Sequence, residues 1–307
     1  MGGNGPAEIA AAATPTSRIS RWKRLGARLS LALLFPFVLL ALTEGALRLG
    51  GYGHSTRFFE SHPDGLSLST NPQFAWSFYS RETSTAPAPL RFSASKAPGT
   101  FRIFVLGESA AVGTPDPAFS FSRMLELMLQ RQYPSNRFEV INAAMRGINS
   151  HIVRHIAREC AALSPDLFIV YMGNNELIGL HAPAPEGFNF TPHLRLLRLG
   201  DAVKALRLSQ LVGAFVRRFG SKAERKMQDM EYLRRQRLAF DDPRRQSAYE
   251  NFRANLEGIC EAAERTGAQT ILATIAVNLR DFPPLASLPR ANLTSAQQSD
   301  FDQAYSL

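Results

Sequence analysis

The hydrophobic positions in the middle of the chain follow two different spacings. Short, mostly apolar runs occur at 101–106, 138–142, 167–172 and 271–277, and apolar residues recur every three or four positions at 121–128, 152–163 and 252–263. Short apolar runs are typical of strands buried on both faces, whereas the wider spacing is typical of amphipathic helices. The alternation predicts an α/β fold in which helices cover both faces of a parallel sheet.

The segments outside this pattern divide the chain further. The stretch between the third and fourth strands is too long for a simple crossover, and Thr294 with Gln297 forms a capping box that predicts a last helix. We expect the following parts: a basic tail at 1–28, an anchor at 29–48, a spacer or small β preamble at 49–98, the α/β domain at 99–285 with a helical, basic insertion at about 180–245, and the start of a helical region at 286–307.

The most apolar run of the chain lies near its amino terminus. Residues 29–42 are almost wholly apolar and follow five Lys or Arg residues. Continued to Arg48, the run has about 20 residues, or roughly 30 Å of helix, which is enough to span a membrane. The positive-inside rule then places the amino terminus in the cytoplasm and the α/β domain outside it, in the periplasm of a bacterial cell envelope. A cleaved signal peptide is the alternative, although no small-residue cleavage site follows the run.

The formal net charge of +9 is concentrated in the amino-terminal tail and the insertion. Neither segment carries a nucleic-acid-binding motif, so we predict no nucleic-acid partner. Anionic lipid near the anchor explains the charge of the insertion, with a solvated helical face as the alternative. Cys160 and Cys260 each fall on the apolar side of a predicted helix, and both are interpreted as buried packing residues.

Three consecutive strand exits carry groups suited to acyl transfer. The first strand leads to Gly107-Glu108-Ser109, the second to a loop that contains Gly147, and the third to Gly173-Asn174-Asn175-Glu176. Because the carboxyl ends of parallel strands meet at one edge of the sheet, a hydroxyl, a main-chain amide and a carboxamide are brought together there. A nucleophile and donors for a developing oxyanion are the groups that acyl transfer needs.

These three motifs resemble blocks one, two and three of the SGNH/GDSL hydrolases, in the same order. The resemblance implies a flavodoxin-like, three-layer fold in which Ser109 is the nucleophile. It also implies an oxyanion hole made by the Ser109 amide, the Gly147 amide and the Asn175 side chain. Glu108 and Glu176 stand where the family usually has Asp; both departures conserve the charge type of the side chain, and neither residue is the primary catalytic group. The third block resembles most a membrane-anchored branch that carries tetratricopeptide repeats.

The last block of the family, D-x-x-H, is not found in this sequence. None of the six histidines has an Asp three residues before it, and the fifth strand that should precede the block is missing. We therefore expect a sheet that is incomplete at its carboxyl-terminal strand, in a chain truncated before this block. Removing the base of a serine hydrolase costs up to about 10⁶ in rate, so this chain alone should be nearly inactive.

His151 and His155 are spaced so that both lie on one face of a helix. A metal pair is conceivable, but no third ligand is evident, so exposed or capping histidines are the simpler interpretation. We predict neither a metal site nor a cofactor.

The leading functional prediction is a membrane-anchored serine esterase or deacylase that acts on an acylated small molecule, lipid or glycan. The alternative is a non-catalytic SGNH-like module that binds an acylated glycan or a protein partner, with helical repeats as its scaffold. A flavodoxin-like domain for a small cofactor is a third possibility, but the sequence has no phosphate-cradling loop.

Overall fold

The computed structural model describes residues 2, 18–113, 115–183, 193–219, 238–239, 241–278, 280–281 and 293–305. Its contacts divide the chain into two compact units, which are described separately. The first unit consists of Met1–Gly53 and Leu206–Phe215, and the second of His54–Ala205 and Val216–Leu307.

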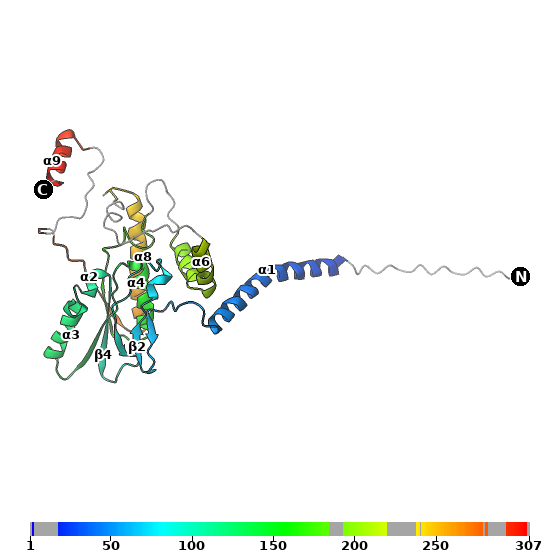
Figure 1. Cartoon of the computed structure of the whole chain (residues 1–307), viewed down its shortest axis with the longest axis horizontal. Helices are drawn as coiled ribbons and strands as arrows, with labels where there is room; N and C mark the ends of the chain where they lie inside the picture. The colour runs from blue at the N-terminus through cyan, green and yellow to red at the C-terminus, as the bar shows by residue number, and fades with distance from the viewer. Residues whose placement is uncertain are drawn as a thin grey trace. The chain divides into compact units, whose positions relative to one another are not determined.

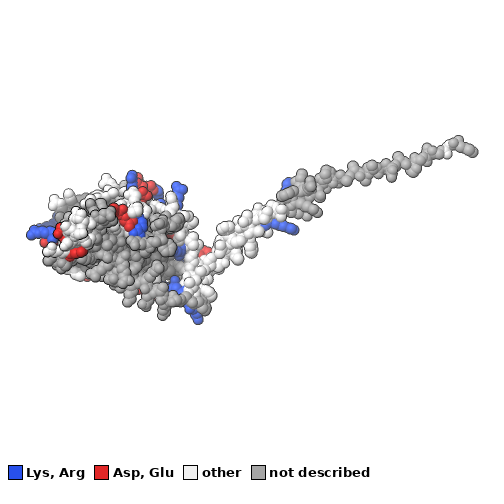
Figure 2. Space-filling model, turned by 90° about the horizontal axis from the view of Figure 1, so that it is seen from above, with Lys and Arg blue, Asp and Glu red and all other residues white. Residues whose placement is uncertain are grey.

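The first unit contains one long helix, α1 (Arg18–Leu49), and the start of a second, α6 (Arg207–Phe219). The segment Arg28–Leu49 of α1 has 22 residues and is long and apolar enough to cross a membrane. Its large apolar side chains are exposed, and the surface drawn along the helix in Figure 2 is almost entirely uncharged. The predicted apolar helix at 29–48 is therefore present.

The second unit is built on a parallel sheet of four strands in the order β5-β4-β6-β7. The strands are β4 (Thr100–Gly107), β5 (Arg137–Asn142), β6 (Leu167–Tyr171) and β7 (Gln269–Leu272). The α/β fold and the first three strands agree with the sequence-based prediction.

The fourth strand is shorter than predicted, since it ends at Leu272 rather than at Val277. The Ala273 amide still donates to the Val170 carbonyl at 2.9 Å. However, β6 ends at Tyr171, the residue that follows Val170. Beyond that point β7 has no neighbouring ladder to join. Within the described residues no strand pairs with its other edge, and Ile271 and Leu272 are about half exposed.

Helices cover both faces of this sheet, as Figure 1 shows around β4. Phe104 and Leu106 of β4 belong to one apolar cluster with residues of α4 (Ser150–Ala161) and α8 (Arg244–Glu264). Ile103 and Val105 face the opposite side, in a second cluster with residues of α2 (Ser109–Val112) and α3 (Phe121–Gln132). Successive side chains of a strand point to opposite faces, so β4 is buried on both.

The segment before β4 adds a small antiparallel sheet of β1 (Phe59–Ser61), β2 (Ser67–Thr70) and β3 (Arg91–Ser93), with a 3₁₀ turn, η1 (Phe74–Ser77). The ring centroids of Phe59 and Phe92 lie 6.5 and 6.1 Å from that of Phe104. These aromatic contacts extend the core of the parallel sheet into the small one.

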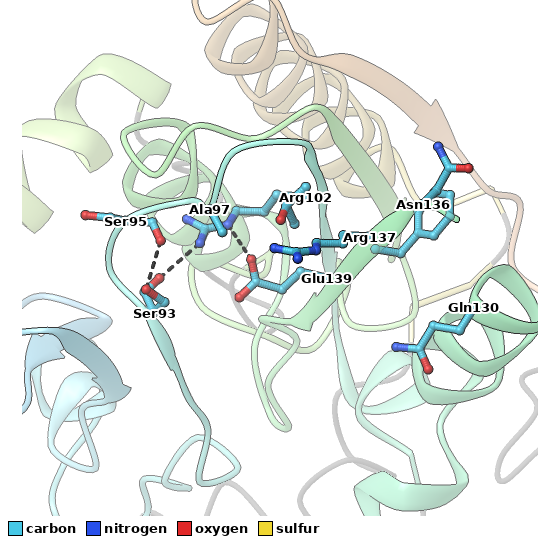
Figure 3. A pocket seen from close by; sticks show the side chains of 10 residues that line it. Ser93, Ser95, Ala97, Arg102, Gln130, Asn136, Arg137 and Glu139 are labelled. Atoms are coloured by element: carbon cyan, nitrogen blue, oxygen red, sulfur yellow. Dashed lines mark hydrogen bonds and ion pairs between the residues drawn. The ribbon is translucent and has the colours of Figure 1, made fainter. Parts of the chain in front are cut away.

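Arg102 connects the two sheets at the amino end of β4 (Figure 3). Its side chain is buried, pairs with Glu139 of β5 at 2.7 Å, and donates to the carbonyls of Ser93 and Leu163 at 3.0 and 2.8 Å. Its own amide donates to Asp166 at 2.6 Å. A single buried guanidinium therefore joins β3, β4, β5 and the loop before β6.

The remaining elements are η2 (Pro117–Phe119), α5 (Leu194–Lys204) and α9 (Ser295–Tyr305). The predicted capping box at α9 is confirmed, because Gln297 Oε1 accepts from the Thr294 amide at 3.0 Å and Thr294 Oγ1 accepts from the Gln297 amide at 3.3 Å. The insertion is helical in α5 and α6, while six of its fourteen Lys and Arg residues, at 220–237, lie outside the described residues.

Both cysteines are free. Cys160 is buried in the core, as expected, but Cys260 is only partly buried. The interpretation of Cys260 as a buried residue was wrong, because its position on α8 is at the edge of the face that packs on α4.

Candidate active site

The turn after β4 brings Ser109 to the carboxyl edge of the sheet. A Cβ at Gly107 would lie 2.3 Å from the Tyr171 carbonyl oxygen, so only glycine lets β4 and β6 approach this closely at their ends. Ser109 then opens the short helix α2 and is partly exposed. Its hydroxyl makes no hydrogen bond to any residue that the structure describes, which leaves the oxygen available to a ligand.

The loop after β5 packs against the turn that holds Ser109. The Asn142 side-chain amide donates to the Ala111 carbonyl at 2.9 Å, and the Met145 amide donates to the Gly107 carbonyl at 3.2 Å. Gly147, further along this loop, is exposed and has a φ of +72°. Within the described residues its amide donates no hydrogen bond, so it is a free main-chain donor, as the proposed oxyanion role requires.

The loop after β6 holds Asn175 through the same neighbouring loop. Asn175 Nδ2 donates to the Ile148 carbonyl at 2.8 Å, next to Gly147. This bond fixes the orientation of the carboxamide and uses one of its two N–H groups, so the second can still donate. The Asn174 amide donates to Glu108 Oε2 at 2.9 Å, which connects this loop to the residue before Ser109.

Hydrogen bonds therefore join all three predicted strand exits. The loops of Gly147 and Asn175 are in direct contact through Ile148, and the Ser109 turn is bound to the other two through Gly107 and Glu108. Catalytic roles for Ser109, Gly147 and Asn175 remain predictions.

Ser109 lies in an open cleft of about 610 Å³. The lining includes small residues and three aromatic rings: Ser109, Ala110, Gly113, Phe119, Ser120, Phe121, Tyr171 and Ala273. A wide, partly aromatic cleft beside a hydroxyl fits an apolar acyl group better than a phosphate or a sugar alone.

Two buried glutamates lie directly beside the site residues in sequence. Glu176 accepts hydrogen bonds from the Ser150 amide and hydroxyl at 2.8 and 2.7 Å, and Asn255 Nδ2 donates to the same hydroxyl at 3.0 Å. Glu108 Oε1 has no donor partner, and the carboxyl groups of Glu108 and Glu176 face each other.

Burial and the negative charge of Glu176 raise the pKa of Glu108 to about 8, and burial also raises the pKa of Glu176. Two adjacent buried carboxylates repel each other, which favours the protonated form of Glu108. Burial and mutual repulsion therefore favour a proton on this pair. This network connects Glu108, Ser150 and Glu176, one from each loop of the candidate site.

The histidines on α4 are not exposed, contrary to the simpler interpretation above. His151 is buried against the His181 ring at a centroid distance of 5.1 Å, and His155 is largely buried against the Phe78 ring at 5.4 Å. Burial lowers the pKa of each to about 4, so both are neutral packing groups at pH 7. Among the described residues, no group of three or more His, Cys, Asp or Glu is placed to hold a metal ion.

The fold also forms a His–Asp pair that does not fit the D-x-x-H pattern, because its members are 20 residues apart and in the reverse order. His181 Nε2 lies 3.1 Å from Asp201 Oδ1, and Asp201 is buried. His181 is not among the described residues that line the Ser109 cleft.

No protein-family model and no curated protein sequence matches this chain. Among solved structures, the chain is similar to TesA at 14% identity and a TM-score of 0.30, over 56% of this chain and 58% of TesA. It is also similar to AlinE4, an SGNH-hydrolase family esterase, at 17% identity and a TM-score of 0.27, over 69% of this chain and 95% of AlinE4. A third is a lipase/acylhydrolase from Enterococcus faecalis, at 16% identity and a TM-score of 0.24, over 56% and 75% of the two chains.

Proposed function

We propose that this chain belongs to a membrane-anchored serine ester hydrolase of the SGNH/GDSL type. The proposal rests on three loops at the carboxyl ends of the strands, which hydrogen bonds hold together. These loops carry a serine hydroxyl and a glycine amide that bond to no described residue, and an asparagine side chain that is held in one orientation.

In the proposed reaction, Ser109 Oγ attacks the carbonyl carbon of an ester and the C=O π electrons move to the oxygen. The amides of Ser109 and Gly147 and the Asn175 side chain stabilise this oxyanion. A general base takes the Oγ proton during the attack and passes it to the leaving oxygen, so collapse of the intermediate expels a neutral alcohol and leaves an acyl-Ser109, which water then hydrolyses. The acyl group would occupy the aromatic cleft at Phe119, Phe121 and Tyr171.

The general base is the part of this machinery that the sequence lacks. We infer that a D-x-x-H segment of the kind the resemblance implies would supply it, and that a further strand of a flavodoxin-like, three-layer fold would pair with the edge of β7 that no strand of the described residues occupies. The half-exposed Ile271 and Leu272 support this inference, because a further strand and its helix would cover them. By itself the chain is then nearly inactive.

The same proposal places the chain in the membrane. Arg28–Leu49 would span it once, with the amino terminus in the cytoplasm and the hydrolase unit in the periplasm, as the preceding Lys and Arg residues favour.

Chemical rescue tests the catalytic part of the proposal. The full chain is incubated with p-nitrophenyl acetate with and without imidazole, and acylation of Ser109 is followed by mass spectrometry. Neutral imidazole can enter the open cleft and supply the missing base, so we expect slow acylation that rises with imidazole concentration. Ser109→Ala should abolish it, and Asn175→Ala should reduce it about 10²-fold.

Two outcomes would contradict different parts of the proposal. Equal acylation of the parent and Ser109→Ala chains would overturn the hydrolase assignment and favour a non-catalytic module that binds an acylated glycan or a protein partner. Fast acylation without imidazole would instead overturn the inferred inactivity. If His181→Ala then removed that activity, the base would be His181.

A further inference from the structure

Helix α6 presents its large apolar side chains outwards. Leu211, Val212 and Val216 are 37%, 55% and 59% exposed and lie on one face, with Phe215 at 65% between them. Half-buried positions include the small or polar residues Ser209, Gly213 and Ala214, together with Leu208 in the first turn. A helix on the surface of a water-soluble protein has the opposite arrangement, with its apolar stripe inside.

The start of α6 is fixed by a side chain of α1. The Arg207 amide donates to Glu44 Oε1 at 3.0 Å and the Leu208 amide donates to Glu44 Oε2 at 2.9 Å. These amides belong to the first turn of α6, where no helical carbonyl can accept from them, and a carboxylate is also favoured there by the helix dipole. Arg48 of α1 pairs with the same carboxylate at 2.7 Å.

The position of Glu44 sets the depth at which α6 begins. Glu44 lies in the last turns of α1, close to its end at Leu49, and charged residues of a membrane span are tolerated at its ends, where they reach the headgroups. If α1 spans the membrane as proposed above, the first turn of α6 is held at the membrane surface. Arg217, on the side of α6 opposite Val212, is exposed and would reach the lipid phosphates or water.

We propose that α6 is an in-plane membrane helix, whose row of Leu211, Val212 and Val216 is buried in the leaflet where α1 ends. This inference rests on the proposed anchor and goes beyond it, because the anchor alone requires no second element in the lipid. Lipid is the occupant because Glu44 binds the first turn of α6 to the end of α1, and the large apolar side chains of α1 between Leu29 and Leu42, which form the proposed span, are exposed. Helices of this kind sit about 5–10 Å into the boundary between headgroups and acyl chains.

Site-directed spin labelling of the full chain tests the proposal. Single cysteines are placed at Leu211, Val212, Arg217 and Leu34 in a Cys160→Ala, Cys260→Ala background, and each chain is reconstituted into vesicles of phosphatidylcholine and phosphatidylglycerol. Accessibility to oxygen, which concentrates in lipid, is compared with accessibility to a water-soluble nickel chelate. We expect labels at 211 and 212 to favour oxygen, the label at 217 to favour nickel, and the label at 34 to show the strongest preference for oxygen.

The pattern separates the possible failures. Labels at 211 and 212 that favour nickel would show that the row faces water. Labels there that are shielded from both reagents would show that protein covers the row. Either result overturns the inference about α6, while oxygen access at position 34 still supports the anchor. Nickel access at position 34 would overturn the anchor itself.

The role of Glu44 has its own test. With a spin label at Ser209, Glu44→Ala should increase the mobility of the first turn of α6, whereas Thr43→Ala, whose hydroxyl bonds only within α1, should leave it unchanged. Equal spectra for the parent and Glu44→Ala chains would show that the carboxylate does not hold α6.

Discussion

At the scale of single residues, the Glu108–Glu176 pair has the clearest consequences. Both carboxyls are buried, and each accepts hydrogen bonds from a loop of the candidate site. Tyr79 also faces the pair, but burial raises the pKa of its hydroxyl, so it stays neutral wherever the carboxyls titrate. Among Glu108, Glu176 and Tyr79, only the two carboxyls therefore change their charge in this pH range.

The pair predicts a stability that falls as the pH rises. Since the pKa of Glu108 is raised to about 8 in the folded chain, the folded state binds this proton more tightly than the unfolded state does. The contribution is complete below the unfolded pKa of about 4.5 and is lost as the pH rises towards 8, at no more than ~1.4 kcal/mol per pH unit. Thermal unfolding between pH 5 and 9 measures the slope.

Glu108→Gln is the matched control for that measurement. A glutamine keeps an acceptor for the Asn174 amide and donates permanently to Glu176, so its stability should depend less on pH over the same range. Glu108→Ala should instead lose about 1 kcal/mol at every pH because the Asn174 amide loses its hydrogen bond to the side chain. Parallel curves for the parent and Glu108→Gln would rule out the shared proton.

Gly107 provides a second prediction at this scale. Gly107→Ala places a Cβ against the Tyr171 carbonyl, so β4 and β6 must separate and we expect a loss of about 2 kcal/mol or more in the free energy of unfolding. Gly200→Ala, in the middle of α5 with open space around it, should be neutral or slightly stabilising. Urea titrations of both variants give the comparison, and similar midpoints would contradict the steric argument.

At the scale of elements, Arg102 is the group that binds the strands together at their amino ends. Arg102→Ala removes a buried cation and leaves Glu139 and two carbonyls without their donor, and we expect a loss of about 3 kcal/mol. Arg137→Ala, at an exposed arginine that begins the neighbouring strand β5, should change stability by less than about 0.5 kcal/mol. Equal urea midpoints for the two variants would refute the role given to Arg102.

The strands and helices were largely predictable because their signal is local. The apolar runs at β4, β5 and β6 are each bounded by polar residues or glycine, and Thr294 with Gln297 specifies its helix start within four residues. The end of β7 was not predictable from its own residues, since Ala273 to Val277 remain apolar while the neighbouring strand has already ended. A strand continues only where a neighbouring strand can pair with it, and the length of that neighbour cannot be predicted from the residues of the strand itself.

The residues of the candidate site also divide into those that the local sequence predicts and those that depend on the fold. Ser109, Gly147 and Asn175 could be proposed because each follows a recognisable strand, and parallel strands end at one edge. The protonation of Glu108 depends on Glu176, far away in sequence, and on the burial of both. Likewise, the burial of His151 depends on His181, and only the fold brings these rings together.

At the scale of the whole molecule, the proposed anchor decides where the proposed hydrolase unit acts. Leu34 and Leu39 lie near the middle of the apolar segment of α1, and each arginine placed there costs about 2.5–3.5 kcal/mol of insertion free energy. We expect the parent chain to stay in the membrane pellet after alkaline carbonate extraction and the Leu34→Arg, Leu39→Arg double variant to be released. Leu49→Arg, at the end of the helix, should behave like the parent.

The same extraction distinguishes the anchor from a cleaved signal peptide. Mass spectrometry of the extracted chain should show residues 18–49 still attached. A soluble parent chain that begins after the apolar run would contradict the anchor and support cleavage.

The path of the chain between its two units has a last consequence, for proteolytic shedding. The polypeptide leaves the first unit after Gly53, returns to it at Leu206 and leaves it again after Phe215. A protease that nicks the peptide bond after Gly53 therefore severs the covalent tether without removing α6 from the fragment that carries Ser109. Because Glu44 still binds the first turn of α6, that fragment should stay on the bilayer, and its release into solution requires a second event that frees α6.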